Sequence, residues 1–200
     1  MGAGILPITI HGNKIYLLFG KEREIDKTPG WSDFAGGQDN NESQFETALR
    51  EGTEELTGFL GSEKNLKKML KKCGTYNVDW NTYRTHIFPM KYDELLPYYY
   101  NNNQRFLQKR LDPKIIEDSK IFEKEEIKWI PIDDLKKMRK KFRSFYQNIV
   151  DILYDDRENI KKFVRRYLNK NGEFKNKTYK NKNNKNNKKS FNSNTRKNRK

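Results

Sequence analysis

The chain has 200 residues, of which 34% are hydrophobic, enough for one domain with a modest core. A single cysteine, Cys73, excludes an internal disulfide and a cysteine-rich zinc site. We expect neither a transmembrane helix nor a signal peptide, because the sequence has no run of about 18 apolar residues and no charged start followed by a long apolar stretch. The net charge of +15 is uneven, because residues 171–200 hold eleven Lys or Arg and one acid.

Hydrophobic periodicity predicts both strands and helices along the chain. The first two apolar runs flank Gly12 and Asn13, which suit a tight turn, so they predict a hairpin. Strands are expected at residues 5–10, 14–19, 31–35, 76–80, 83–90 and 126–130. Helices are expected at residues 43–56, 64–72 and 104–111, from Asp133 or Asp134 onwards, and over residues 140–168. Because these elements alternate without a regular βαβ rhythm, we expect a mixed α+β domain.

The last thirty residues differ in composition from the rest. They contain ten Asn and only three large apolar residues, too few to offset the entropy of ordering them. We therefore divide the chain into a folded domain, residues 1–170, and a disordered Lys/Asn-rich tail, residues 171–200. The tail is either an electrostatic arm for nucleic acid or another polyanion, or a product of compositional drift.

Three glutamates in the helix predicted at residues 43–56 indicate a divalent cation. Glu51, Glu54 and Glu55 have the spacing i, i+3, i+4, which places them on one helix face, about 5–6 Å apart at their Cβ atoms. Like charges at this spacing destabilise a helix, and Mg²⁺ prefers carboxylate oxygens and joins them to phosphates. Arg50 could hold a carboxylate by a bidentate pair. Without their surroundings, a solvated acidic face remains the simpler interpretation.

The surroundings resemble the Nudix box, G-x5-E-x7-R-E-U-x-E-E-x-G-U, in which U is an aliphatic residue. The matching residues are Gly36, Glu42, Arg50, Glu51, Glu54 and Glu55. The segments YLLFGKER, WSDFAGG and EKEEIKWIPIDDL are similar to the family's first strands, its W-x-x-P-G-G approach and its late segment. The resemblance covers residues 1–155, loosely between 60 and 118, and extends to Nudix proteins of large DNA viruses.

The chain departs from the box at four places. Gly52 replaces an aliphatic residue, and the glycine after the glutamates is Gly58, one place later than expected at Thr57. Ala35 replaces the usual proline, and the spacing selects Gly36, the first glycine of its pair rather than the second. These departures put the helix end and the loop shape in question and leave the arginine and the glutamates in place.

The resemblance implies a Nudix-like α/β/α sandwich with a mixed sheet and the hydrolysis of a pyrophosphate bond in a nucleoside-diphosphate-linked substrate, with Mg²⁺ or Mn²⁺. It implies Glu51, Glu54 and Glu55 as metal ligands, with Glu54 also counted as catalytic. Arg50 orients these groups or forms a purely structural salt bridge. The loop at Gly36 and Gly37 lies beside the substrate.

A general base or an extra ligand is expected from the acidic run before Trp129. Some Nudix enzymes use a glutamate of this region, and Glu126 is our first choice and Glu123 our second. The alternative is an ordinary acidic loop that leads into a strand.

Two basic clusters suggest a large anionic partner. We expect nucleic-acid contacts at Lys68, Lys71, Lys72, Lys140 and Arg143. Each cluster taken alone also fits a solvated surface. RNA is therefore the expected partner, and the 5′ cap of mRNA is the leading specific substrate, so that decapping is the leading reaction.

Other substrates and another class of function stay open. Diphosphoinositol polyphosphates and small nucleotides are the alternative substrates. A non-catalytic RNA-binding Nudix module and a structural polyanion-binding protein are the alternatives of another class. No membrane association is expected, and the expected location is the cytoplasm, or the host cytoplasm or virion for a viral protein.

Overall fold

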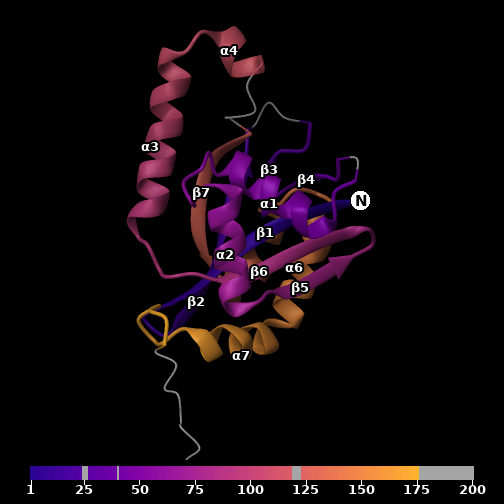
Figure 1. The fold of residues 1–200 in the computed structure, drawn as a ribbon, viewed down its shortest axis with the longest axis vertical. Coiled ribbons are helices and arrows are strands. Elements are labelled where there is room, and N and C mark those ends of the chain that lie inside the picture. Colours follow the sequence, from indigo (N-terminus) through magenta and orange to yellow (C-terminus); the bar gives the residue numbers. More distant parts are fainter. Residues whose placement is uncertain (24–26, 40, 119–122, 176–200) are drawn as a thin grey trace, which may run out of the picture.

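A computed structural model describes residues 1–23, 27–39, 41–118 and 123–175 (Figure 1). The elements follow in the order β1 (Gly2–His11), β2 (Lys14–Glu22), β3 (Gly30–Ser32), β4 (Phe34–Gly37), α1 (Gln44–Glu55), α2 (Glu63–Cys73), β5 (Tyr76–Trp80), β6 (Tyr83–Pro89), α3 (Leu95–Arg110), α4 (Pro113–Asp118), β7 (Lys124–Pro131), α5 (Leu135–Met138), α6 (Tyr146–Asp155) and α7 (Arg157–Tyr167). Within the described ranges, none of these helices is long and apolar enough to cross a membrane.

The strands form one mixed sheet with β1 near its centre. β1 pairs with β6 in parallel and with β2 and β4 antiparallel. β6 in turn pairs antiparallel with β5. One edge of β2 pairs with β1 from Lys14 to Leu17 and with β3 from Gly20 to Glu22, and the other edge pairs with β7 from Tyr16 to Glu22. The predicted hairpin is thus confirmed. The single strand expected at residues 31–35 is instead split at the fully buried Asp33 into β3 and β4.

Helices cover both faces of this sheet. Successive side chains of a strand point to opposite faces, so Ile5 joins a core with α1, α2 and α3, whereas Leu6 joins a core with α6 and α7. The predicted α/β/α sandwich with a mixed sheet is therefore confirmed (Figure 1).

Helix α3 is longer than the sequence indicated. The prediction began at residue 104, because Pro97 and the three asparagines after Tyr100 are poor helix formers. The helix nevertheless begins at Leu95, since Pro97 lies in its first turn, where a missing N–H is tolerated, and Tyr100 and Gln104 are buried. The short α4 was not predicted.

Helix α3 also covers the outer edge of β7. The side-chain amide of Asn101 donates to the carbonyl oxygen of Ile127 at 3.1 Å and accepts from its N–H at 2.8 Å. In the part of the chain that the structure describes, β7 pairs with no strand other than β2. The amide therefore takes the hydrogen bonds that a further strand would make.

The boundary predicted at residue 170 needs correction. Residues 171–175 lie against the domain, because the backbone N–H of Lys175 donates to Tyr167 at 2.8 Å and Phe174 bridges to Leu168. Phe174 also packs against the core cluster that contains residues of β1 and α7. This packing and the backbone hydrogen bonds hold the short return against the domain. The rest of the predicted tail, residues 176–200, lies outside the described residues.

Candidate active site

Helix α1 is fixed at its start and packed tightly along its length. Ser43 and Glu46 form a capping box, in which the N–H of Glu46 donates to the Ser43 hydroxyl and the N–H of Ser43 donates to the Glu46 carboxylate. Further along, a Cβ at Gly52 would overlap Ile5 of β1. Glycine therefore replaces the expected aliphatic residue because the helix lies too close to the sheet for a side chain.

The same close approach brings two glutamates against β4. A Cβ at Gly36 would overlap the carboxyl group of Glu51, so any other residue here would displace that carboxyl group from its present position. The backbone N–H of Ala35 donates to Oε2 of Glu55 at 2.8 Å. A proline has no N–H, so alanine at this position provides a hydrogen bond that the family's usual residue could not give.

Arg50 ties the loop before α1 to the helix. Its Nε and Nη2 donate to the two oxygens of Glu42 at 2.8 and 3.1 Å, and its Nη1 donates to Glu51 at 2.7 Å. A further bond of 3.0 Å reaches the carbonyl oxygen of Gly37. The guanidinium lowers the pKa of Glu42 to about 2. The sequence left Glu42 without a role, and the structure makes it the anchor of the arginine.

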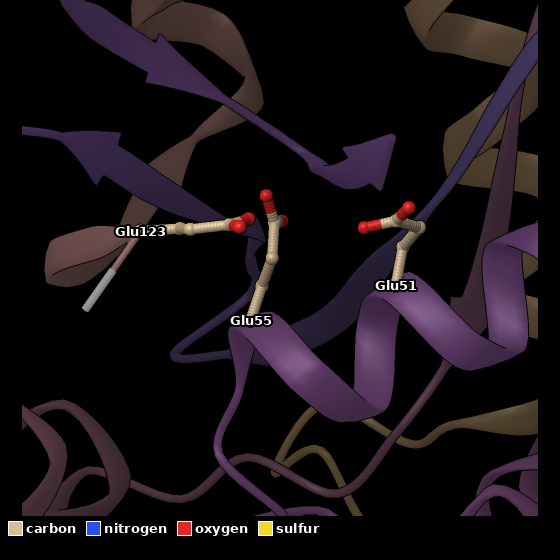
Figure 2. Close-up of side chains that lie close together, drawn as sticks. All are labelled: Glu51, Glu55 and Glu123. Atoms are coloured by element: carbon tan, nitrogen blue, oxygen red, sulfur yellow. The ribbon is translucent and has the colours of Figure 1, made fainter. Parts of the chain in front are cut away.

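Three carboxylates from two distant segments converge beside β4. Ligand oxygens of Glu51, Glu55 and Glu123 all lie within 4.8 Å of one another. Figure 2 shows Glu51 and Glu55 rising side by side from α1, while Glu123 reaches toward Glu55 from the segment before β7. Such a set of oxygens suits Mg²⁺ or Mn²⁺. Glu54 is outside this group, and its side chain is more exposed, at 38%, and 3.6 Å from Nη1 of Arg50.

A buried lysine stands behind the carboxylates. Lys124 is fully buried, with its Nζ 3.3 Å from Oε1 of Glu55 and 3.0 Å from the Ser32 hydroxyl, and it also donates to Glu22. Burial alone would lower the pKa of Lys124, but the carboxylates of Glu55 and Glu22 hold it above its ordinary value. No sequence pattern pointed to this residue, because a lysine in an acidic run is normally exposed.

A second buried carboxyl lacks such a cation at hydrogen-bond distance. Asp33 accepts hydrogen bonds from the hydroxyls of Tyr83 at 2.5 Å and Thr85 at 2.7 Å. Burial raises its pKa to about 6, although these bonds and the more distant Lys124 oppose the shift. Asp33 lies between β3 and β4, and the free-energy cost of burying its carboxyl group therefore depends on pH.

The remaining predicted site residues lie apart from this group. Glu126 lines a pocket of about 320 Å³ between α3 and β7, together with Arg105. Lysines 68, 71 and 72 are exposed on α2, and Lys140 is exposed after α5. Arg143 instead turns inward and donates to Glu22 at 2.6 Å and Thr28 at 2.7 Å. The structure thus separates the two basic clusters and ties Arg143 into the core.

Comparison with known proteins gives matches among solved structures alone, since no family model and no curated protein matches the chain. An Ap4A hydrolase of C. elegans is 16% identical, with 80% of this chain and 97% of that chain covered and a TM-score of 0.45. The Nudix hydrolase RenU of M. smegmatis is 13% identical (80% and 86% covered, TM-score 0.47), and a MutT protein of Methanosarcina mazei is 15% identical (79% and 93%, TM-score 0.40). The chain is similar to these solved structures, one of which is a Nudix hydrolase. The residues that match the Nudix box lie on β4, the following loop and α1.

Proposed function

We propose that the chain is a Nudix phosphoanhydride hydrolase that cuts a pyrophosphate bond in a nucleotide-containing substrate with Mg²⁺ or Mn²⁺. The observation that carries this proposal is the convergence of Glu51, Glu55 and Glu123 within 4.8 Å. The box spacing predicted two of the three, and the third comes from the acidic run in which a further ligand or base was expected.

The proposed roles follow from the contacts of each residue. Glu51, Glu55 and Glu123 would hold the cation, which when bound neutralises the diphosphate and acidifies its water. Arg50 orients Glu51 through its pairing with Glu42. The loop at Gly36 and Gly37 gives the diphosphate close access, because a Cβ at Gly37 would meet no atom within 4 Å.

Two carboxylates remain as candidates for the proton acceptor. Glu54 is on α1 beside the carboxylate group and is partly exposed. Glu126 is further along β7 and lines the pocket next to α3. We propose Glu54 as a ligand or base and keep Glu126 as the alternative base. Separate Glu54→Gln and Glu126→Gln variants distinguish them, because loss of the base should lower kcat by about 10²–10⁴-fold.

For the substrate we propose the 5′ cap of RNA. Support comes from the net charge of +15 and from the exposed lysines of α2, which suit a long polyanion better than a small nucleotide. Diphosphoinositol polyphosphates and small nucleoside diphosphates are the competing substrates. Such an enzyme would act in the cytoplasm, which is the host's cytoplasm if the source is a virus.

The test is a substrate panel of capped RNA, nucleoside diphosphate derivatives and diphosphoinositol compounds, each with Mg²⁺ and Mn²⁺. The parent is compared with Glu55→Gln and with Glu63→Gln, a matched change at an exposed glutamate on α2. We expect metal-dependent cleavage by the parent and by Glu63→Gln, and a loss of about 10²–10³-fold for Glu55→Gln. A folded Glu55→Gln variant with full activity would overturn the proposed metal site, and an inactive parent that binds RNA would instead favour a non-catalytic RNA-binding module.

A further inference from the structure

A second pocket lies on the other side of α2 from α1, where α2, the end of β6 and the C-terminal return meet. It has a volume of about 470 Å³ and is lined by Met69, Lys72, Pro89, Met90, Lys91, Tyr92, Asp93 and Phe174. Its walls are mainly apolar, with two aromatic rings and two lysines. The one acid among them, Asp93, is directed to the start of α3, because its Oδ1 accepts the N–H groups of Leu95 and Leu96.

Both aromatic rings of the pocket are held in place. The ring of Tyr92 stacks on His11 with centroids 4.1 Å apart. The ring of Phe174 has the Nζ of Lys72 at 3.5 Å from its centroid and packs on the core. Fixed, flat and apolar walls of this kind suit another flat ring, and stacking of this type accepts any nucleobase.

Positive charge continues from this pocket in two directions. The exposed lysines of α2 are Lys64, Lys67, Lys68, Lys71 and Lys72, and the helix has one acid, Glu63, in its first turn. These lysines extend over about 12 Å of helix, so they match a row of phosphates rather than a single one. The chain leaves the pocket at Lys175, and residues 176–200 contain ten Lys or Arg and no acid.

The pocket is separate from the carboxylate group. On β1, Ala3 pairs with Gly36 beside the glutamates, whereas Ile8 pairs with Pro89 at the pocket. Five residues of strand separate these positions by about 17 Å. One nucleotide cannot fill both sites, but one polynucleotide can reach from one to the other.

We propose that this pocket binds a base of a single-stranded nucleic acid whose phosphates lie along the lysine face of α2. This pocket would hold the RNA that is the substrate under the proposed function. Only the identity of that RNA rests on the proposed function. Binding at the pocket needs neither metal nor hydrolysis. The two proposals can therefore fail separately.

The test measures binding of the full chain to a fluorescent single-stranded RNA with a 5′ hydroxyl group, which offers no pyrophosphate bond, by anisotropy in EDTA. Tyr92→Leu and Phe174→Leu keep apolar bulk and remove the flat ring. We expect each to weaken binding about fivefold or more at every salt concentration, and to leave binding of duplex RNA unchanged, because paired bases cannot enter the pocket. Lys72→Ala should weaken binding and reduce the salt slope by about one. Lys162→Ala, at an exposed lysine of α7 on the other face of the sheet, is the matched control.

Three results would overturn the proposal. The first is unchanged affinity in both ring variants while their thermal unfolding matches that of the parent. The second is an equal loss of duplex binding, and the third is equal competition by polyglutamate, which would assign the lysines to acidic proteins. If a ring variant unfolds, substitutions at exposed lysines test the pocket instead. Lys72→Ala and Lys91→Ala, at the pocket, must then weaken RNA binding more than Lys64→Ala at the far end of α2. Equal losses of affinity in the three variants would reject the pocket as the binding site.

Discussion

Helices α1 and α2 follow each other in the chain and pack on the same core, yet their charged side chains differ in burial. The charged groups of α1 that face β4 are buried or half-buried, and each has a short contact, such as Arg50 with Glu42 or Glu55 with the N–H of Ala35. The lysines of α2 point outward. A buried charge must be paired, and removing its partner damages the fold, whereas an exposed charge is free to meet a ligand. Charge changes should therefore cost stability around α1 and leave it unchanged on α2.

The sharpest test of this contrast removes the buried ammonium behind the site. Lys124→Met leaves the carboxylates of Glu55 and Glu22 buried without their cation, so the free energy of unfolding should fall by about 3–5 kcal/mol. Urea denaturation measures this fall. Lys128→Met, at an exposed position of the same strand, is the control and should change stability little. Adding Glu55→Gln should restore part of the loss, and the contrast is broken if Lys124→Met is as stable as the control.

A pH titration extends the contrast to Asp33, a buried carboxyl that accepts hydrogen bonds from two hydroxyl groups. The pKa of Asp33 is about 6 in the fold against an ordinary 3.8, so its stability penalty is present above pH 6 and disappears as the pH falls below 4. The shift corresponds to about 3 kcal/mol. Asp33→Asn should remove this component. The difference in unfolding free energy between parent and variant, measured from pH 7 to pH 4, should move in favour of the parent as the pH falls. A difference that stays constant would contradict the assignment.

Loss of the Arg50 contacts should lower the rate of catalysis, with an effect smaller in free energy than the two effects above. Arg50→Lys keeps the charge but loses the bidentate pairing with Glu42, so Glu51 is less well positioned. We expect kcat/KM to fall about 10- to 100-fold. Arg84→Lys is a matched control, since Arg84 makes a similar bidentate pair with Asp79 on the exposed surface. Equal effects of the two variants would mean that the Arg50 pairing has no special role.

The smallest effect on stability is expected on α2. The double variant Lys68→Ala and Lys71→Ala removes two exposed charges, so the free energy of unfolding should change by less than about 0.5 kcal/mol. Its affinity for RNA should fall, together with the dependence of that affinity on salt. Thermal unfolding and anisotropy measure the two quantities. A large loss of stability with unchanged RNA affinity would reverse the contrast between the helices.

The sequence predicted the local parts of the fold and site better than the distant ones. Helix spacing placed Glu51 and Glu55 on one face because both lie on a single element. It named Glu123 only as the second choice for a base or extra ligand, after Glu126, because the approach of the β7 segment to α1 depends on the whole sheet. Pairing between distant strands and helices is not encoded in any short pattern.

Departures from the family pattern became informative once the neighbours were known. Gly52, Ala35 and the shifted Gly58 looked like weaknesses of the match. The structure explains the first by contact with Ile5 and the second by a hydrogen bond to Glu55. At the helix end, Thr57 and Gly58 both take positive φ angles, of 47° and 73°, so the position where the family has glycine is left-handed here as well, although a threonine occupies it. Such reasons lie in three-dimensional contacts, and sequence alone could not supply them.

The amide of Asn101 has a consequence for how copies of this protein behave in a crowded solution. It imitates a peptide group and so occupies the docking points at Ile127 that an incoming chain would need to extend the sheet. One side chain of α3 thereby opposes the addition of a further strand at this edge, and with it the edge-to-edge association that leads to fibres.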